Sequence, residues 1–433
     1  MLIGIDASRA NRTHKSGTEW YSYYLIKELA KLDKVNRYIL YTDEPLREDL
    51  VDLTETDYKE PASDHAIELD QDGYQKIKSP HNNFRAKVLN WPFKYLWTQG
   101  RLSIEMMFFR PDVLFVPSHT LPFIHPRKSI VTIHDVGFGR ERRLYEKSKM
   151  GPADWKQRTV LDFLVRLFTL GRYGANSEDY NIWSTVFGLK RAKKIITVSN
   201  FSKKEIIAVF GAARGLRGKL ENKVAVVHNG YDKKFCLFTS DAEKKRQLLY
   251  KYGIETPYIF YVGRLERKKN ITGLLEAFAL MIERNKNIPH KLVLAGDASY
   301  GYDEIIYMIN QYNLHDRVRK TGWVEEAELP FIYNWADAFV LPSLYEGFGI
   351  PLLQAMACGI PIAASNAASI PEVAGDAAIY FDPTDVNSIS RTLELICTDS
   401  DLRKRLIEKG AKRVENFGWD ISARRTLELI NQL

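Results

Sequence analysis

The chain has 433 residues, of which 45% are hydrophobic and 27% are charged, so it is neither a disordered chain nor a collagen-like repeat. Its 62 Lys and Arg residues outnumber its 54 Asp and Glu residues, which gives a net charge of +8. This excess is compatible with an ordinary solvated surface, an anionic substrate, an anionic membrane or nucleic acid. Three scattered cysteines without CxxC spacing exclude a zinc or redox motif and favour a reducing compartment.

The first residues do not have the pattern of a signal peptide, and no apolar run reaches the roughly 18–20 residues of a spanning helix. We therefore expect a cytoplasmic protein.

Short apolar and β-branched runs, each closed by turn residues, predict strands along most of the chain. These runs lie at residues 2–8, 38–42, 113–118, 129–136, 194–199, 223–230, 258–264, 291–297, 339–343 and 361–365. Apolar positions at three-to-four spacing predict helices at 19–32, 271–284, 302–312 and 386–397. Ser202 with Glu205, and Ser369 with Glu372, match the capping-box pattern of a helix start. The alternation of strands and helices predicts an α/β protein with parallel sheets.

The strand–helix pattern starts again after residue 232, and residues 233–257 are typical of a linker followed by a helix. We therefore predict two doubly wound domains with a cleft between them, one covering residues 1–235 and the other 236–417.

Two segments depart from the alternation. Residues 137–192 form a long connection between two strands, and residues 84–109 mix Arg and Lys with Trp and Phe. The second segment predicts either helices packed on the first sheet or a surface that meets lipid or a lipid-linked substrate. The membrane interpretation depends on six residues, namely Lys87, Trp91, Phe93, Lys94, Trp97 and Arg101.

The segment 339–382 carries the densest chemical signal. Glu346 follows a predicted strand, and Gly347 and Gly349 would let the backbone approach a ligand closely. Pro351 occupies a favoured first-turn position of a helix, whose free N–H groups favour anions. The Glu346 carboxylate suits sugar hydroxyls better than phosphate. A tight turn with a solvated glutamate is the alternative interpretation.

Two further clusters follow strands. The guanidinium of Arg264 can bind two phosphate oxygens at once, and the ammonium of Lys269 can add a positive charge. An ordinary basic loop is the alternative interpretation. Because ligands of open α/β sheets bind beyond the carboxyl ends of strands, both residues are candidates for phosphate binding. In the first half, His134 ends an apolar strand and Gly17 precedes a helix, where it could admit a phosphate.

Together these motifs resemble the retaining family 4 glycosyltransferases with the GT-B fold. The matching pieces are GRLERKKN (263–270), TGWV (321–324), the segment 341–365, IPEVAGDAA (370–378), VHNG (227–230), VSNFSKKEI (198–206) and TIHD (132–135). The YEGFGIP segment is most similar to mannosyltransferases and related hexosyltransferases. The resemblance also implies that the final helix, 418–433, packs back on the first domain.

The resemblance implies a role for each site residue. Arg264 and Lys269 would bind the donor diphosphate, and Glu346 would contact the donor sugar. His134 would lie near the transferred sugar, Gly17 beside the diphosphate, and the backbone of Val324 at the base. The remaining donor-binding positions are Gly347, Phe348, Gly349, Ile350 and Gln354.

Gln354 departs from the family pattern. It stands eight residues after Glu346, where the family's E-x7-E motif has a second acid that binds ribose hydroxyls. An amide still accepts a hydrogen bond there but loses the charge-assisted strength, so we expect weaker donor binding. A catalytically weak sugar-nucleotide-binding protein is therefore an alternative.

The resemblance implies a nucleotide-sugar donor as co-substrate, no cofactor, and same-face substitution with retention, in which the departing phosphate helps to deprotonate the acceptor. Two DxD sequences, Asp70–Asp72 and Asp399–Asp401, lie away from the candidate strand ends, so we expect surface loops and metal-independent transfer. The favoured donor is GDP-mannose, with a UDP- or dTDP-sugar as the alternative. We expect a saccharide or lipid-linked acceptor, contact with the inner face of an anionic membrane, and no nucleic acid, since no such motif is present.

Overall fold

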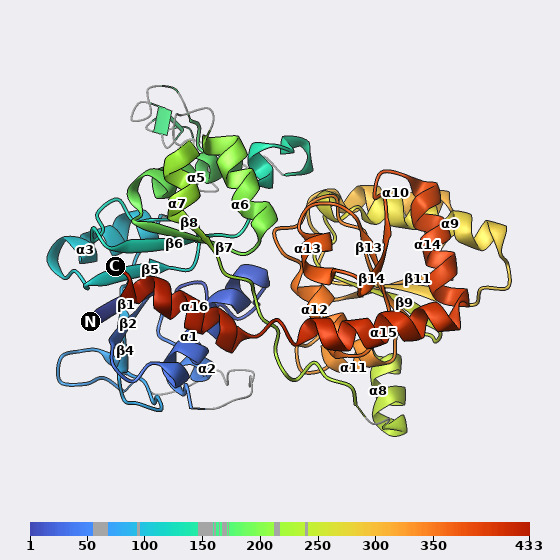
Figure 1. Ribbon diagram of the computed structural model, residues 1–433, viewed down its shortest axis with the longest axis horizontal. Coiled ribbons are helices and arrows are strands. Elements are labelled where there is room, and N and C mark those ends of the chain that lie inside the picture. Colours follow the sequence, from blue (N-terminus) through green and yellow to red (C-terminus); the bar gives the residue numbers. More distant parts are fainter. Residues whose placement is uncertain are drawn as a thin grey trace. The chain divides into compact units, whose positions relative to one another are not determined.

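Figure 1 shows the computed structural model of the chain. The structure describes residues 1–54, 68–92, 96–145, 159, 162–163, 165–166, 171, 173–211, 217–238 and 241–433. The chain forms two compact units. The first unit comprises Met1–Asn229 together with Trp419–Leu433, and the second unit comprises Gly230–Gly418. The N-terminal stretch of the first unit thus ends at Asn229. The sequence pattern had predicted this boundary at residue 235.

The first unit is built on an eight-stranded sheet with the order β3-β4-β2-β1-β5-β6-β7-β8. Its strands are β1 (Leu2–Asp6), β2 (Arg37–Thr42), β3 (Gln75–Lys76), β4 (Phe84–Val88), β5 (Val113–Val116), β6 (Ser129–Ile133), β7 (Lys194–Thr197) and β8 (Val224–Val226). Neighbouring strands are parallel except for β3, which pairs antiparallel with β4. β5 and β6 are buried along their whole length, as expected for strands covered on both faces.

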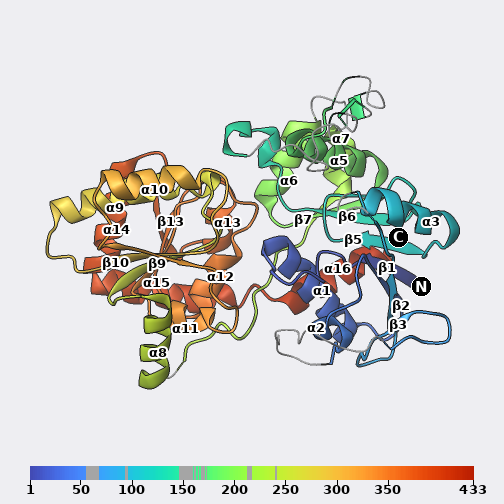
Figure 2. The same cartoon turned by 180° about the vertical axis from the view of Figure 1, so that it is seen from behind.

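Helices flank this sheet. They are α1 (Gly17–Leu32), α2 (Glu48–Val51), α3 (Ser103–Phe108), α5 (Ser177–Arg191), α6 (Asn200–Ile206), α7 (Arg217–Lys223) and α16 (Trp419–Asn431). The last helix lies beside α1 in both views (Figures 1 and 2), where the rings of Tyr24 and Trp419 stack at 5.4 Å. Ser422 also donates a 2.5 Å hydrogen bond to the carbonyl of His228. The end of the chain is therefore an integral part of the first unit.

The second unit is built on a six-stranded parallel sheet with the order β11-β10-β9-β12-β13-β14. Its strands are β9 (Tyr258–Val262), β10 (Lys291–Ala295), β11 (Val318–Gly322), β12 (Ala338–Leu341), β13 (Ile362–Ser365) and β14 (Ala378–Phe381). Its helices are α8 (Ala242–Tyr252), α9 (Ile271–Arg284), α10 (Tyr302–Gln311), α11 (Leu329–Asn334), α12 (Ile350–Ala357), α13 (Ile370–Ala374), α14 (Val386–Thr398) and α15 (Ser400–Val414). Figure 2 shows α9, α10 and α14 on one face of this sheet and α11, α12 and α15 on the other.

The two sheets, parallel except for β3, and their flanking helices confirm the predicted α/β class. Four strands were not predicted, namely β3, β4, β11 and β14. The prediction of helix at the start of 84–109 was wrong, because Phe84–Val88 pairs with β2 as a strand. In the part of the chain that the structure describes, no helix is both long enough and apolar enough to span a bilayer.

Both predicted capping boxes were also wrong. The cap of α6 is Ser199, whose side chain accepts from the backbone N–H of Ser202. Ser369 makes no cap hydrogen bond and instead donates to the carbonyl of Glu346. A reciprocal pattern occurs at the start of α1, where the Glu19 carboxylate accepts from the backbone N–H of Ser16 at 3.2 Å.

Candidate active site

The strand order of the second unit singles out one point of its sheet. The chain runs outward from β9 through β10 to β11, and in the opposite direction from β12 through β13 to β14. β9 and β12 are neighbours, so their carboxyl ends form the point at which the order reverses. Ligands of open α/β sheets bind outside such a point. The loops 263–270 and 342–349 begin there.

These two loops are bonded to each other. The backbone N–H of Leu344 donates to the carbonyl of Lys268 at 2.9 Å. The side-chain nitrogen of Lys269 lies 2.5 Å from Oε1 of Glu346, and only 16% and 11% of these side chains are exposed. The hydroxyl of Ser343 donates to the same carboxylate oxygen at 2.8 Å. The structure thus brings together a cation and an acid that the sequence placed in separate clusters.

The backbone of Glu346 is also fixed. Its carbonyl accepts a 2.9 Å hydrogen bond from the hydroxyl of Ser369, at the start of α13. Tyr261 is buried beneath the loops, and its hydroxyl donates to the carbonyl of Arg264. Burial, followed by the nearby carboxylates of Glu346 and Glu266, raises the pKa of Tyr261 well above its usual value. The buried, neutral side chain of Tyr261 therefore supports the loop that carries Arg264.

Arg264 is presented to solvent. Its side chain is 58% exposed, and its guanidinium lies 3.5 Å from the carboxylate of Glu266. That distance leaves donors of the guanidinium fork available for another anion. Arg264 is therefore the more accessible of the two candidate phosphate-binding cations.

Two glycines allow the loop that carries Arg264 to fit. A Cβ atom on Gly296 would lie 2.1 Å from the carbonyl oxygen of Gly263, closer than any side chain can tolerate. Both residues have positive φ angles, of 131° and 148°, that non-glycine residues rarely adopt. The ends of β9 and β10 can approach each other this closely only because residue 296 is glycine, whereas a side chain at 263 would meet the hydroxyl of Tyr261.

The turn after Glu346 ends in a helix start. Gly349 has a φ of 96° and precedes α12, which carries Pro351 in its first turn as predicted. Pro351 has no N–H, and the N–H of Leu352 donates to the carbonyl of Gly349 at 3.0 Å, so the N–H of Ile350 is the first-turn donor that remains for an anion. Phe348 is 3% exposed and packs edge-on against Phe417, so it supports the turn from below and does not reach into solvent.

Gln354 and Val324 occupy the neighbouring positions. The Oε1 atom of Gln354, in the middle of α12, accepts a 3.1 Å hydrogen bond from the hydroxyl of Tyr333. Val324 follows β11 and is 6% exposed, directly after Trp323 and the left-handed Gly322. Burial of the valine side chain leaves its backbone as the part that a base could contact.

The predicted histidine of the first unit lies at the end of β6. The Nε2 atom of His134 is 3.1 Å from the carbonyl of Pro117, and its ring stands edge-on to Tyr21 at 4.6 Å. Burial lowers the pKa of His134. A carbonyl can only accept, so the neutral ring carries its proton on Nε2 and leaves Nδ1 as an acceptor for a ligand hydroxyl.

Gly17 is the first residue of α1, and no atom lies within 4 Å of the position its Cβ would occupy. The space beside it is open. Because Gly17 has no side chain, a ligand can approach its backbone closely. The backbone conformation of the turn does not itself require glycine at this position.

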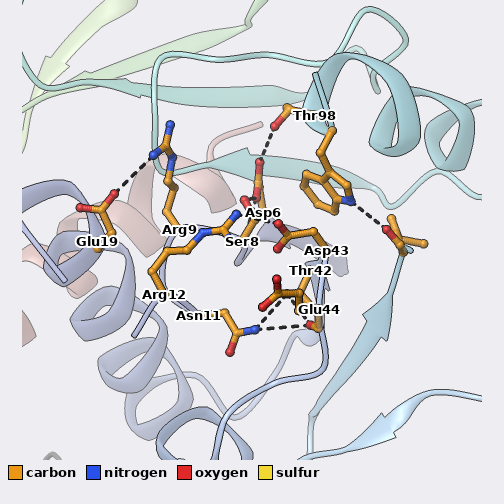
Figure 3. Close-up of polar contacts among 12 residues, drawn as sticks. Asp6, Ser8, Arg9, Asn11, Arg12, Glu19, Thr42, Asp43, Glu44 and Thr98 are labelled. Carbon is orange, nitrogen blue, oxygen red and sulfur yellow. Dashed lines mark hydrogen bonds and ion pairs between the residues drawn. The ribbon is translucent and has the colours of Figure 1, made fainter. Parts of the chain in front are cut away.

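Sequence reasoning missed a polar cluster at the carboxyl ends of β1 and β2, which Figure 3 shows. Asp6 is 3% exposed and accepts from the hydroxyl of Ser8 at 2.6 Å and from Thr98 at 3.4 Å. Burial raises the pKa of Asp6. Arg9 lies 3.4 Å from Glu19, and Arg12 lies 2.6 Å from Asp43. β1 and β5 adjoin at the point where the strand order of this sheet reverses.

This cluster is extended by His119, in the loop after β5, and by Tyr180 of α5. Burial, followed by the charges of Arg9 and His134, lowers the pKa of His119 to about 4. The hydroxyl of Tyr180 accepts a 2.8 Å hydrogen bond from Gln99. The edge of the first sheet therefore offers neutral donors and acceptors flanked by the partly exposed guanidinium groups of Arg9 and Arg12. No short motif marks these residues, because they come from five separate segments of the chain.

The two DxD sequences have local roles. Asp70 Oδ1 accepts from the backbone N–H groups of Asp72 and Tyr74, and Asp399 caps α15 through the N–H of Leu402. Within the described residues, no three His, Cys, Asp or Glu side chains gather as metal ligands.

The comparisons with known proteins identify the family. Residues 243–413 match the family model described as glycosyl transferases group 1. O-antigen chain mannosyltransferase B of Escherichia coli is 31% identical over 334 residues, which cover 76% of this chain and 82% of that protein. The chain belongs to the glycosyl transferases group 1 family.

Other relatives of this glycosyltransferase are longer. The serotype-specific mannosyltransferase WbdA of Escherichia coli is 28% identical over 288 residues, and the match spans 65% of this chain but only 34% of that protein. Among solved structures, sucrose-phosphate synthase from Thermosynechococcus elongatus has a TM-score of 0.68 at 19% identity, with 100% of this chain and 98% of that chain covered.

WaaG, a glycosyltransferase involved in lipopolysaccharide biosynthesis, has a TM-score of 0.65 at 13% identity, with 99% of both chains covered. These structural similarities confirm the GT-B type of fold that the sequence motifs implied.

Proposed function

We propose that this glycosyltransferase moves a mannosyl group from GDP-mannose to a saccharide or lipid-linked saccharide in the synthesis of a surface polysaccharide. The similarity to O-antigen chain mannosyltransferase B, over most of both chains, is the observation that carries the choice of mannose. The site geometry supports the proposal, because a cationic loop and a carboxylate meet at the reversal point of the second sheet.

In this proposal, Arg264 and Lys269 bind the diphosphate of the donor. Negative charge grows on the phosphate as the glycosidic bond breaks, and fixed cations stabilise that charge. Arg264 has the exposure that such contact requires, and Lys269 is held in place by Glu346. The N–H of Ile350 at the start of α12 would add a further donor to the phosphate, and Glu346 would accept hydrogen bonds from the donor sugar.

The acceptor would bind at the polar edge of the first sheet. His134, with Nδ1 free to accept, and the neutral His119 suit sugar hydroxyls. Asp6 lies at the reversal point of that sheet, and Arg9 could contact an acceptor phosphate. This edge is therefore the part of the first unit that we assign to the acceptor.

We further propose transfer with retention of configuration, without a metal ion, at the cytoplasmic face of a membrane and without a nucleic-acid partner. The departing phosphate would take the proton of the acceptor hydroxyl. The local roles of Asp70 and Asp399 as turn and helix-cap residues support the metal-independent mechanism.

A catalytically weak sugar-nucleotide-binding protein is the second candidate, and Gln354 is the observation that favours it. Its carbonyl oxygen is already engaged by Tyr333, so the contribution of this position to ribose binding is reduced. The two candidates differ in turnover, not in nucleotide binding.

The test is a transfer assay with GDP-mannose, UDP-glucose and dTDP-glucose, each offered with a panel of mannose-terminated glycans. We expect GDP release and a new α-linked mannose, seen by NMR, only with GDP-mannose, and loss of both in Lys269→Met. Turnover with another donor would replace the mannose assignment. Donor binding without turnover on any acceptor would favour the second candidate.

A further inference from the structure

The first unit carries a group of exposed apolar side chains on α3 and on the loop that is bonded to it. We call it the apolar patch, and it consists of Ile104, Met107, Phe108, Phe109 and Phe123. Phe108, Phe109 and Phe123 are 69%, 61% and 57% exposed, and Ile104 and Met107 are more than 40% exposed. Single exposed apolar side chains are common, but five on one short helix and its neighbouring loop mark an interaction surface.

The members of the patch are held together by the fold. The backbone N–H of Phe123 donates to the hydroxyl of Ser103, the first residue of α3, at 2.8 Å. The ring of Phe123 packs on Trp183 and Phe187 of α5, at 5.5 and 5.9 Å. α3 lies at the periphery of the first unit in both views (Figures 1 and 2). The patch is therefore a rigid surface.

Cationic side chains lie on the chain segments next to the patch. Arg110, Arg127 and Lys128 are exposed on the segments that adjoin it. The Nε atom of Arg110 donates to the carbonyl of Met106 at 2.7 Å, which holds this guanidinium against the end of α3. These three cations outnumber the exposed acid of the same segments, Asp112, so the border of the patch is basic.

The acid of α3 does not offset this charge. Glu105 is buried, and its carboxylate pairs with Lys87 at 2.6 Å and with Arg101 at 3.6 Å. The Lys87 nitrogen also lies 4.4 Å from the ring of Phe109. An apolar centre with a basic border is the pattern of a protein surface that lies on anionic lipid.

The patch differs from the stretch that the sequence indicated. Trp97 is buried, with its ring nitrogen bonded to the carbonyl of Leu89, and Lys87 is engaged by Glu105. Phe93 and Lys94 lie outside the described residues. Of the remaining two, Trp91 is partly buried against the core and Arg101 faces Glu105. The exposed aromatic residues lie one helix further along the chain.

We propose that the apolar patch docks this glycosyltransferase on an anionic lipid bilayer. The phenylalanine rings enter the interfacial region of the bilayer, while the surrounding arginines and lysines contact lipid phosphates. A symmetric dimer through the same face would bring two basic borders together, which disfavours a second copy as the occupant. The inference rests on the proposed function only in that a lipid-linked acceptor explains why the enzyme would meet a membrane.

The test is flotation of the full-length protein with vesicles of equal parts phosphatidylcholine and phosphatidylglycerol, and with pure phosphatidylcholine vesicles. We expect wild-type protein to float with the anionic vesicles only, and less as salt is added. The double variant F108S/F123S is expected to lose at least about tenfold in partitioning, since membrane binding scales with buried apolar area. The control Y250S removes an aromatic residue that is 89% exposed in the second unit, and is expected to float like wild type.

A charge variant, R127E/K128E, separates the two contributions and is also expected to lose anionic binding. Failure of wild-type protein to float, or equal flotation of F108S/F123S, would overturn the proposal. So would a concentration-dependent dimer that F108S/F123S abolishes. Transfer from GDP-mannose to a water-soluble acceptor is measured in parallel, and F108S/F123S is expected to retain this activity. Loss of membrane docking can then be distinguished from failure of the proposed function.

Discussion

The side-chain nitrogen of Lys269 lies 2.5 Å from Oε1 of Glu346, although 77 positions of sequence separate the two residues. This ion pair joins the two loops that follow β9 and β12. A cation for phosphate and a carboxylate for sugar hydroxyls thus stand side by side at the reversal point of the sheet, and each holds the other in position.

Substitution of either partner of this pair should harm both folding and transfer. Lys269→Met and Glu346→Gln are each expected to lower the free energy of unfolding by about 1–3 kcal/mol, because the remaining partner loses a charge-assisted hydrogen bond in a largely buried site. Transfer should fall by about 10²–10³-fold, the effect of removing one preorganised stabilising group. Urea unfolding and donor turnover measure the two effects.

A double-mutant cycle provides the control for this pair. The double variant should be less destabilised than the sum of the single variants, because the two side chains contact each other. Additive losses of stability would contradict direct coupling between Lys269 and Glu346.

Gln354→Glu should strengthen donor binding. The carboxylate would keep the hydrogen bond from Tyr333 and add an oxygen with a full charge for the ribose hydroxyls. We expect the Kd for the donor nucleotide to fall by about three- to tenfold, measured by calorimetry, whereas Gln354→Ala should raise it. An unchanged Kd in both variants would remove this position from the donor site.

The pKa of His119 predicts a specific pH dependence of stability. Above its ordinary value of 6.5 the side chain is neutral in the folded and unfolded states, so it makes no pH-dependent contribution. Between 6.5 and about 4 the unfolded chain binds a proton that the folded chain does not, so stability falls as the pH falls through this window. The loss is at most about 3 kcal/mol.

His119→Gln should therefore flatten the dependence of urea unfolding on pH between 7 and 4. His315→Gln, at an exposed position of the second unit, is the matched control and should follow the wild-type curve. A steeper loss of stability in His119→Gln than in wild type would show that burial does not hold this histidine neutral.

Chelation should leave transfer unchanged. The Oδ1 atoms of Asp70 and Asp399 accept hydrogen bonds from backbone N–H groups, so these aspartates stabilise a turn and a helix start. Activity in excess EDTA should match activity without it, and Asp70→Asn should behave like wild type. Loss of activity in EDTA that manganese or magnesium restores would contradict the metal-independent mechanism.

Most of the strands that were predicted have side chains that are buried on both faces, and β8, with two partly buried residues, is an exception. Ile3, Val131 and Phe260 lie in uninterrupted apolar runs, and tertiary context does not alter what such runs form. β4 was missed because Arg85 and Lys87 interrupt its apolar positions. Arg85 stacks on Tyr74 at 3.8 Å, a contact that only the folded sheet provides.

The candidate site was predictable to the extent that its residues occur in motifs. Arg264, Lys269 and Glu346 follow predicted strands, and their chemistry could be read from short segments. The contact between Lys269 and Glu346 could not, because it depends on β9 and β12 being neighbours. Asp6, Arg9 and His119 carry no motif, and their significance arises from the strand order of the first sheet.

The most direct measurement is a calorimetric titration of GDP and of UDP into wild-type protein and into Arg264→Ala, with Arg391→Ala on the exposed side of α14 as control. The account predicts that GDP binds more tightly than UDP, that Arg264→Ala weakens GDP binding by about 10–100-fold, and that Arg391→Ala binds like wild type. Absence of nucleotide binding, tighter binding of UDP, or unchanged binding by Arg264→Ala would contradict it.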